Sequence, residues 1–162
     1  METEIINIEK EDEFQVIIGQ ANFIKTTEDI YEALVSSTPD IKFGVGFNEA
    51  SGPCLTRGEG NDPLLENIAK MNAFRIGAGH CFVVIFKNAF PINVLNNLKN
   101  VYEVTRIYSA SSNKTQVVVG ITDQGRAILG IVDGEKPKAI EAENHKKERR
   151  KYLRDIGYKL DL

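Results

Sequence analysis

The sequence predicts one α/β domain, with a mixed β-sheet of about six or seven strands packed with helices. The chain has 162 residues, of which 42% are hydrophobic, and this is enough for a single full core. Short runs rich in β-branched residues alternate with runs whose apolar residues recur at helical spacing. Neither the Gly-x-x-x-x-Gly-Lys-Ser/Thr loop nor a Gly-x-Gly-x-x-Gly turn is present, so neither a P-loop fold nor a Rossmann fold is predicted.

The first third of the chain contains strand, helix and loop signals in turn. Residues 4–8 and 14–18 are β-rich runs separated by charged residues, and they predict an antiparallel hairpin. Thr26 is the expected N-cap of a helix that ends before Pro39. Residues 41–47 alternate with period two, which predicts a strand with apolar residues on one face and glycines on the other. Residues 48–61 contain four Gly or Pro residues and no hydrophobic rhythm, so we expect a long polar loop.

The remainder of the chain continues the alternation. Asp62 is the expected N-cap of a second helix, with Pro63 at its first position. The glycines at 77 and 79 predict a tight turn into a strand at 81–86 that is apolar throughout and therefore buried on both faces. The last expected elements are a helix at 91–99, strands at 101–108, 116–121 and 126–132, and a charged helix after Ala139.

The two parts of the chain differ in charge. Residues 1–66 hold 14 Asp and Glu against 4 Lys and Arg, a balance of −10, and residues 67–162 hold 9 against 16, a balance of +7. Such opposite surfaces belong either to one domain, where they face each other, or to neighbouring subunits. The second arrangement leads us to expect a homo-oligomer, with a trimer as a guess. Because the whole chain is acidic and its basic part has few aromatic residues, we expect no nucleic-acid partner.

Location is predicted from what the sequence lacks. No apolar run reaches the ~18 residues of a membrane span, and the first residues are acidic, unlike a signal peptide. The two cysteines, Cys54 and Cys81, form no disulfide framework. We therefore expect a cytoplasmic protein with no membrane partner.

His80 is the first candidate for chemistry. It lies between the Gly77–Gly79 turn and a buried strand, where glycines allow a ligand to approach the backbone and leave N–H groups for an anion. A histidine with a reference pKa of ~6.5 is largely neutral at pH 7, so a ring nitrogen can act as a nucleophile or a base. The alternative is a purely structural histidine at the start of a strand.

The loop before the second helix is the next candidate. Arg57 and the backbone N–H groups of Gly77 and Gly79 are suited to phosphate. Glu49 or Asp62 is suited to accept a hydroxyl proton or to hold magnesium. The alternative is a solvated loop in which Asp62 is only a helix cap.

Amides and a further arginine complete the candidate set. Asn48, Asn61 and Asn93 are assigned to nucleoside binding, because amides can recognise a base or ribose edge, although exposed asparagines on helices are common. Arg126 is a weaker candidate for phosphate, since Asp-Gln-Gly-Arg is also an ordinary hairpin turn.

Four short segments occur in a characteristic order: Gly77–His80, Phe90–Asn96, Gly125–Gly134 and Leu153–Lys159. Over nearly the whole chain, from about Phe14 to Lys159, the series resembles the adenosine-specific kinase family. The resemblance implies an α/β fold unrelated to conventional kinases and binding of adenosine and its phosphates. It also implies a histidine that carries a phosphoryl group, and that histidine is His80 here.

The residues and the resemblance together predict transfer of a phosphoryl group from ATP to adenosine, giving AMP, through a phosphohistidine at His80. ATP is the expected cofactor, with magnesium as a candidate second one, and adenosine and adenine nucleotides are the expected partners. Two alternatives remain open. One is a non-catalytic sensor that binds AMP or ADP, and the other is a nucleotide phosphohydrolase.

Overall fold

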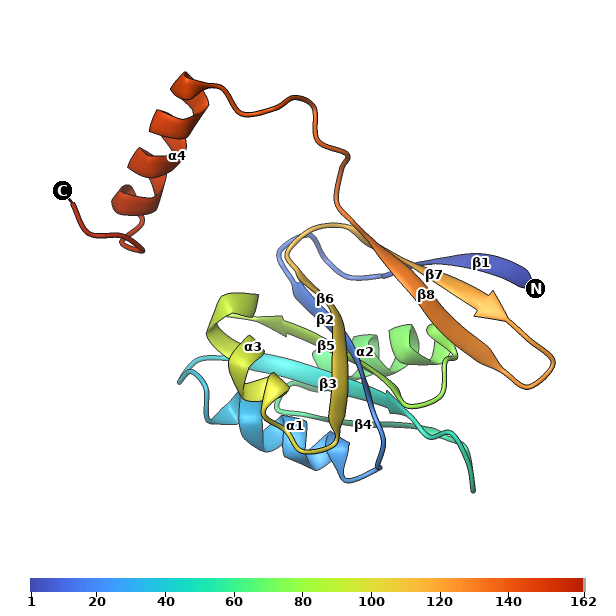
Figure 1. The fold of residues 1–162 in the computed structure, drawn as a ribbon. Coiled ribbons are helices and arrows are strands. Elements are labelled where there is room, and N and C mark those ends of the chain that lie inside the picture. The colour runs from blue at the N-terminus through green and yellow to red at the C-terminus, as the bar shows by residue number, and fades with distance from the viewer. Residues whose placement is uncertain (162) are drawn as a thin grey trace.

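The computed structural model describes residues 1–161, and Figure 1 shows its eight strands and four helices. Along the chain these are β1 (Glu2–Asn7), β2 (Gln15–Ala21), α1 (Thr26–Val35), β3 (Lys42–Asn48), β4 (Thr56–Gly60), α2 (Pro63–Ile76), β5 (Cys81–Lys87), α3 (Pro91–Lys99), β6 (Val104–Ser111), β7 (Thr115–Ile121), β8 (Arg126–Asp133) and α4 (Glu143–Asp155). The predicted α/β fold is confirmed, with eight strands in place of six or seven.

The strands form two sheets rather than one. A five-stranded sheet has the order β4-β3-β5-β2-β6, and a three-stranded sheet has the order β1-β7-β8. Every pairing between the described strands is antiparallel, whereas we predicted a mixed sheet. The apolar run of β5 reflects its cover on both faces, and such a run does not reveal the direction of neighbouring strands.

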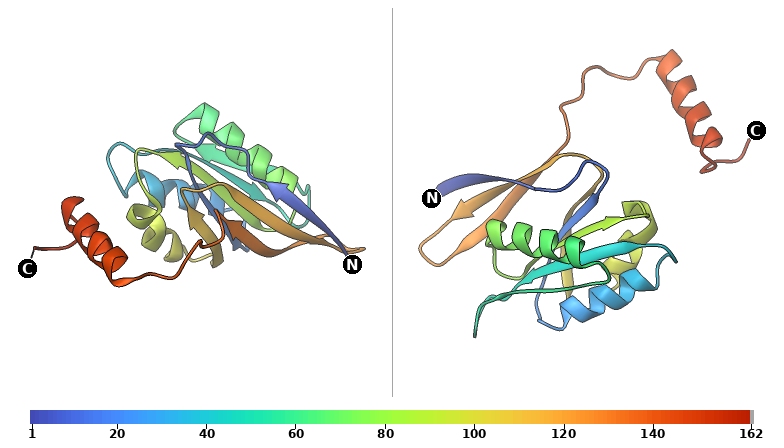
Figure 2. Two further views of the ribbon diagram at one scale, coloured as in Figure 1. Left: turned by 90° about the horizontal axis from the view of Figure 1, so that it is seen from above. Right: turned by 180° about the vertical axis from the view of Figure 1, so that it is seen from behind.

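The five-stranded sheet is the middle of three layers (Figures 1 and 2). Helices α1 and α3 pack on one face, in a core that includes Ile30, Leu34 and Val94. Helix α2 and the three-stranded sheet share the other face, in a core that includes Leu65 and Val119. The sheet is therefore buried on both sides, while its strand ends remain available for a site.

Strand β3 shows how the sequence specifies this packing. Its phenylalanines Phe43 and Phe47 point into the core under α1 and α3, as their alternation predicted. The glycines between them face α2: a Cβ on Gly44 would lie 2.1 Å from the backbone nitrogen of Glu66, and one on Gly46 would lie 2.5 Å from the carbonyl oxygen of Ala69. Only glycine allows the helix to pack this closely on the strand.

Two local predictions are wrong. The runs at 4–8 and 14–18 do not form a hairpin, because β1 pairs with β7 while β2 pairs with β5 and β6. The segment predicted as a long loop at 48–61 contains strand β4, which pairs with β3 at the edge of the sheet. Its sequence, Thr-Arg-Gly-Glu-Gly, lacks a buried apolar face and so gives no strand signal.

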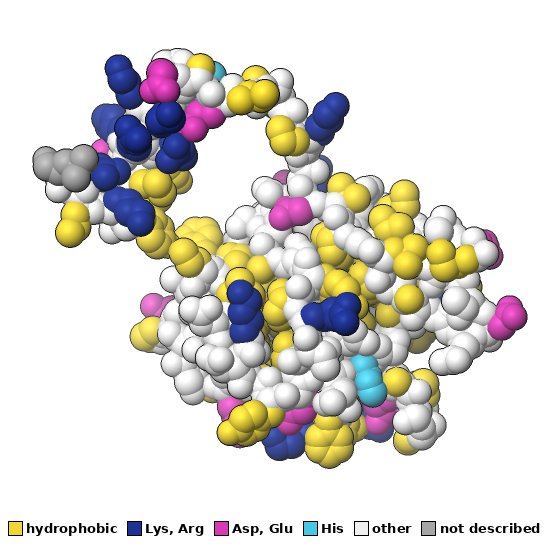
Figure 3. Space-filling model, viewed as in Figure 1, with side chains coloured by type: hydrophobic (Ala, Val, Ile, Leu, Met, Phe, Trp, Pro, Cys, Tyr) yellow, Lys and Arg dark blue, Asp and Glu magenta, His cyan; other side chains and the backbone are white. Residues whose placement is uncertain are grey.

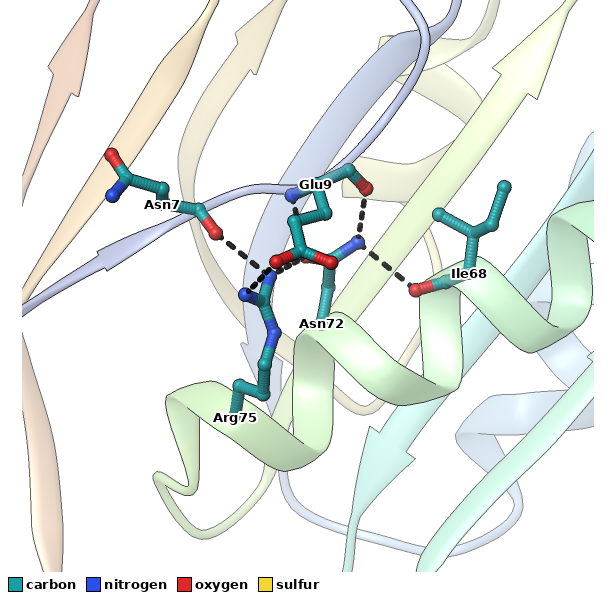
Figure 4. Close-up of polar contacts among 5 residues, drawn as sticks. All are labelled: Asn7, Glu9, Ile68, Asn72 and Arg75. Carbon is teal, nitrogen blue, oxygen red and sulfur yellow. Dashed lines mark hydrogen bonds and ion pairs between the residues drawn. The ribbon is translucent and has the colours of Figure 1, made fainter.

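A polar cluster fixes the link between the two sheets (Figure 4). The amide of Asn72 on α2 is buried. Its oxygen accepts the N–H of Glu9 at 2.9 Å, and its nitrogen donates to the carbonyl of Glu9 at 2.8 Å. Arg75 pairs with the Glu9 carboxylate at 2.8 Å and donates to the carbonyl of Asn7 at 2.7 Å. These bonds hold the chain where it leaves β1, so residues 9–13 cross between sheets instead of making a tight turn.

Candidate active site

The backbone of His80 is held in an unusual conformation. Its φ of 62° lies in the left-handed region, which costs a residue other than glycine about 1–3 kcal/mol. Two neighbouring strands maintain it: the N–H of His80 donates to the carbonyl of Asn48 at 2.8 Å, and the carbonyl of His80 accepts the N–H of Ala21 at 2.9 Å. Strain of this kind is often found at functional sites.

The His80 ring lies flat against an apolar wall. It stacks on the buried ring of Phe47 with centroids 5.9 Å apart and an interplanar angle of 13°. The side chain is partly exposed, and neither ring nitrogen has a hydrogen-bond partner within residues 1–161. Both nitrogens are therefore available to a ligand.

Arg57 reaches the same face of the sheet as the His80 ring. It is the direct cross-strand partner of Phe47, and such partners project on one side of an antiparallel pair. Its guanidinium pairs with the Glu49 carboxylate at 3.1 Å, while its buried Nε has no acceptor among the described residues. This arginine is held in place and keeps donors for an anion.

Glu49 pairs with Arg57 and with the backbone of its own loop. Its other carboxylate oxygen accepts the N–H of Leu55 at 2.8 Å. That hydrogen bond, followed by the one from Arg57, lowers the pKa of Glu49 below its usual value. A carboxylate this committed to its ionised form is a poor acceptor for a hydroxyl proton at neutral pH.

A hollow of about 620 Å³ lies beside Arg57, between β4 and the start of α1. Lys25 lines it and forms ion pairs with Asp29 and with Glu103, the latter at 2.8 Å. Burial alone would raise the pKa of Asp29, but the hydrogen bonds to Lys25 and Glu103 and the charge of Lys25 together outweigh it, and the pKa falls. The same two carboxylates raise the pKa of Lys25, so the hollow contains two fixed cations, Lys25 and Arg57.

Sequence reasoning did not find this second cation. We predicted Thr26 as the helix N-cap, but Thr26 is the first helical residue and Lys25 occupies the cap position without a side-chain cap bond. The spacing of Lys25 and Asp29 was an available signal, because residues four apart meet on a helix. Glu103 gave no signal, since its contact with Lys25 joins residues 78 positions apart.

The side chain of Asn48 is engaged in the fold beside the His80 turn. It is buried, and its amide nitrogen donates to the carbonyls of Ala73 at 2.7 Å and Ala78 at 3.0 Å. Its amide oxygen accepts the hydroxyl of Thr56 at 2.7 Å. The assignment of Asn48 to nucleoside binding stays a prediction.

Asp62, Asn61 and Asn93 lie at the other end of the sheet. In the antiparallel pair of β3 and β4, Thr56 is opposite Asn48 beside His80, whereas Gly60 is opposite Gly44. Asp62 follows Gly60 and only caps α2, accepting the N–H groups at 64 and 65. At ~3.3 Å per residue it is more than 10 Å along the strand from the His80 end. The structure thus places Asp62 away from His80, and its role as base or magnesium ligand stays a prediction.

The two asparagines are likewise committed to the backbone. Asn61 accepts the N–H of Phe43 at 2.9 Å and donates to the carbonyl of Ile41 at 2.8 Å. Asn93 accepts the N–H of Phe90 at 2.8 Å at the start of α3, which follows the end of β5 opposite His80. Neither amide lies at the His80 end of the sheet, and their assignment to nucleoside binding stays a prediction.

The predicted phosphate ligands divide into available and engaged groups. The N–H of Gly77 donates to the carbonyl of Ala73 as the C-cap of α2, so it is not free, while Gly79 is exposed. Arg126 approaches the turn from the three-stranded sheet, on the face opposite the His80 ring. It donates to the carbonyl of Ile76 at 2.9 Å and pairs with Glu4 at 2.9 Å. Arg126 thus braces the turn instead of pointing at the ring.

Residues 1–161 contain neither a candidate metal cluster nor a helix that could span a membrane. No group of three or more His, Cys, Asp or Glu side chains is placed to hold a metal ion. Across the same residues, no helix has the length and apolar character needed to cross a membrane.

Comparison with known proteins finds one matching family and a similar solved structure. Residues 6–159 match the family described as adenosine specific kinase. The crystal structure of the PH1918 protein from Pyrococcus horikoshii OT3 is similar to the chain, with 52% sequence identity, a TM-score of 0.95 and coverage of 99% of each chain. No curated protein matches the chain.

Proposed function

The chain belongs to the adenosine-specific kinase family, and from that premise we propose that His80 carries a phosphoryl group from ATP to adenosine. A nucleoside-kinase type of function follows from the family; the histidine route is our proposal. The observation that carries it is the His80 turn itself: a strained backbone, a ring with two unengaged nitrogens, and Arg57 on the same face of the sheet.

The proposed reaction has two steps. A neutral ring nitrogen of His80 attacks the γ-phosphorus of ATP, the bond to the bridging oxygen breaks, and ADP leaves with the electron pair. The 5′-hydroxyl oxygen of adenosine then attacks the same phosphorus, the nitrogen–phosphorus bond breaks, and the released imidazole takes the hydroxyl proton. No carboxylate is needed as the base, which agrees with the engaged state of Glu49 and the distant position of Asp62.

The surroundings supply the electrostatics that such a transfer needs. Phosphoryl transfer depends mainly on positioning and on positive charge around the equatorial oxygens. Arg57 and Lys25 provide that charge from opposite walls of the hollow, and the exposed Gly79 backbone is a further donor. Magnesium is proposed to arrive with the ATP phosphates, because it usually binds through one or two carboxylates plus substrate.

The chain offers a matched control for the test, because it has one other histidine, His145. The protein is incubated with γ-labelled ATP, and label that is acid-labile and stable to base is measured in the wild type, His80→Ala and His145→Ala. We expect label in the wild type and His145→Ala only. Adding adenosine should then move the label into AMP.

Three outcomes would overturn the proposal. Label that persists in His80→Ala would place the phosphoryl group elsewhere. Tight AMP binding in calorimetry without AMP formation from adenosine would favour a nucleotide sensor. Phosphate release that does not require adenosine would favour a phosphohydrolase.

A further inference from the structure

Helix α4 stands apart from the rest of the molecule. After β8 the chain runs through an extended segment at 134–142 and then forms α4, which Figures 1 and 2 show away from both sheets. No residue of α4 is buried, and several large apolar side chains on and around it are exposed, namely Ile140, Tyr152, Ile156, Tyr158 and Leu160. We call residues 134–161 the C-terminal arm.

Local interactions specify the arm helix well. The N–H of Ala142 donates to Nδ1 of His145 at 3.0 Å, and Arg149 binds both carboxylate oxygens of Glu141, at 2.8 and 3.1 Å. At its end Gly157 adopts a left-handed φ of 83°, and the N–H of Tyr158 returns to the carbonyl of Leu153 at 3.0 Å. The sequence therefore encodes a helix with defined ends.

These local bonds are not enough to hold the helix on its own. Isolated helices shorter than ~12–15 residues are marginal in water, and α4 has 13 residues. Most helices gain their stability by burying an apolar face. Tyr152 and the C-cap residue Ile156, four residues apart, form such a face at the end of α4, and neither side chain is buried by residues 1–161. The face therefore needs a surface outside this copy.

The net charge of the C-terminal arm indicates which molecule provides the surface that it needs. Residues 1–133 contain 17 acidic and 11 basic side chains, a balance of −6, whereas residues 134–162 contain 6 and 9, a balance of +3. Figure 3 shows the Lys and Arg side chains gathered over α4. A second copy of the chain has the complementary charge, and exchange between copies would bury every arm in the same way.

We propose that the C-terminal arm docks on the body, residues 1–133, of a second copy of this chain, through Tyr152 and Ile156 and with electrostatic support from the basic side chains on the same side of α4. This inference does not depend on the chemistry at His80. It places the acidic body of one copy against the basic arm of another.

The test uses the full chain and two variants. Tyr152→Ala/Ile156→Ala removes the apolar face without lowering helix propensity. Lys147→Ala is the matched control, because its side chain lies nine residues from Ile156 and so, at ~100° per residue, on the opposite side of the helix. Sedimentation velocity over a wide concentration range measures assembly, and amide hydrogen exchange at 146–156 measures protection of the arm.

We expect the wild type and Lys147→Ala to assemble, with arm amides protected only in the assembled form. The double variant should raise the dissociation constant about tenfold or more. Added salt should weaken wild-type assembly as well. Exchange of β5 amides checks that the body remains folded.

Three results would overturn the proposal. One is assembly of the double variant as strong as that of the wild type, which would place the interface elsewhere. Another is arm protection in a monomer at every concentration, which would mean docking within one copy. The third is rapid exchange of the arm amides in every assembled state.

Discussion

The two ends of the five-stranded sheet carry similar polar residues in different settings. At one end Asp62, Asn61 and Asn93 each close backbone hydrogen bonds next to a helix or strand terminus. At the other end backbone hydrogen bonds hold His80 in a left-handed conformation, and Arg57 and Lys25 line a hollow. The difference teaches that a polar residue type does not by itself mark a candidate site, because most such residues are already engaged in the fold.

The largest effect beyond His80 itself is expected for Asn48→Ala. The substitution removes one of the two donors to each of the buried carbonyls of Ala73 and Ala78. These carbonyls keep the backbone N–H groups of Gly77 and Cys81. Each lost hydrogen bond costs about 0.5–1.5 kcal/mol, so we expect a loss of stability of about 1–3 kcal/mol and a fall in His80 phosphorylation measured below the lowered melting temperature. Thr56→Val, which removes only the hydroxyl bond to Asn48, should cost less.

The prediction for Asn48→Ala joins two effects, on stability and on His80 phosphorylation, and it is contradicted if only the first is seen. Asn48→Ala protein that is less stable but phosphorylates His80 at the wild-type rate would show that Asn48 does not position the turn. Denaturant unfolding and the label assay, carried out on the same sample, separate the two effects.

An intermediate effect is expected for Glu49→Gln. Glutamine keeps an oxygen for the Leu55 N–H but removes the charge that holds Arg57, so we expect a roughly tenfold lower rate of His80 phosphorylation. Arg57→Lys should lower the rate by a similar factor, because lysine lacks the planar fork of donors. An unchanged rate in both variants would remove Arg57 from the site.

The pH dependence provides a further check on Glu49. Because its pKa is lowered in the folded protein, its contribution to stability is present above the usual value of 4.5 and is lost as the pH falls through the lowered pKa. The rate measured between pH 5 and pH 8 should therefore show no ionisation of Glu49. A rate that titrates near neutral pH in the wild type but not in Glu49→Gln would make Glu49 the base after all.

The smallest effect on activity is expected at the opposite end of the sheet. Asp62→Ala removes the cap that accepts the N–H groups at 64 and 65, which should cost about 0.5–2 kcal/mol of stability. The kcat and KM for AMP formation should stay at their wild-type values at temperatures where the variant is folded. A large fall in kcat would show that residues at both ends of the sheet belong to one active site.

Local patterns predicted much of the architecture. The Gly44 and Gly46 face of β3, the Asp62 cap of α2 and the Gly77 turn were all predicted, because each depends on residues close in sequence. Strand β4 was missed, because an edge strand with glycines and charges carries no hydrophobic period. The opening hairpin was wrong because Asn72, 63 residues away, determines the path of the chain at Glu9.

The sequence by itself determined most of the elements, the glycine turn and His80 as the candidate nucleophile. Propensity, capping and periodicity act over a few residues and so can be recognised without the fold. Only the tertiary structure decided which candidates meet. Strand register placed Arg57 opposite Phe47 and moved Asp62 to the far end, and strand pairing brought Glu103 to Lys25. Register and pairing result from burying two faces of one sheet at once, and that is a property of the whole chain.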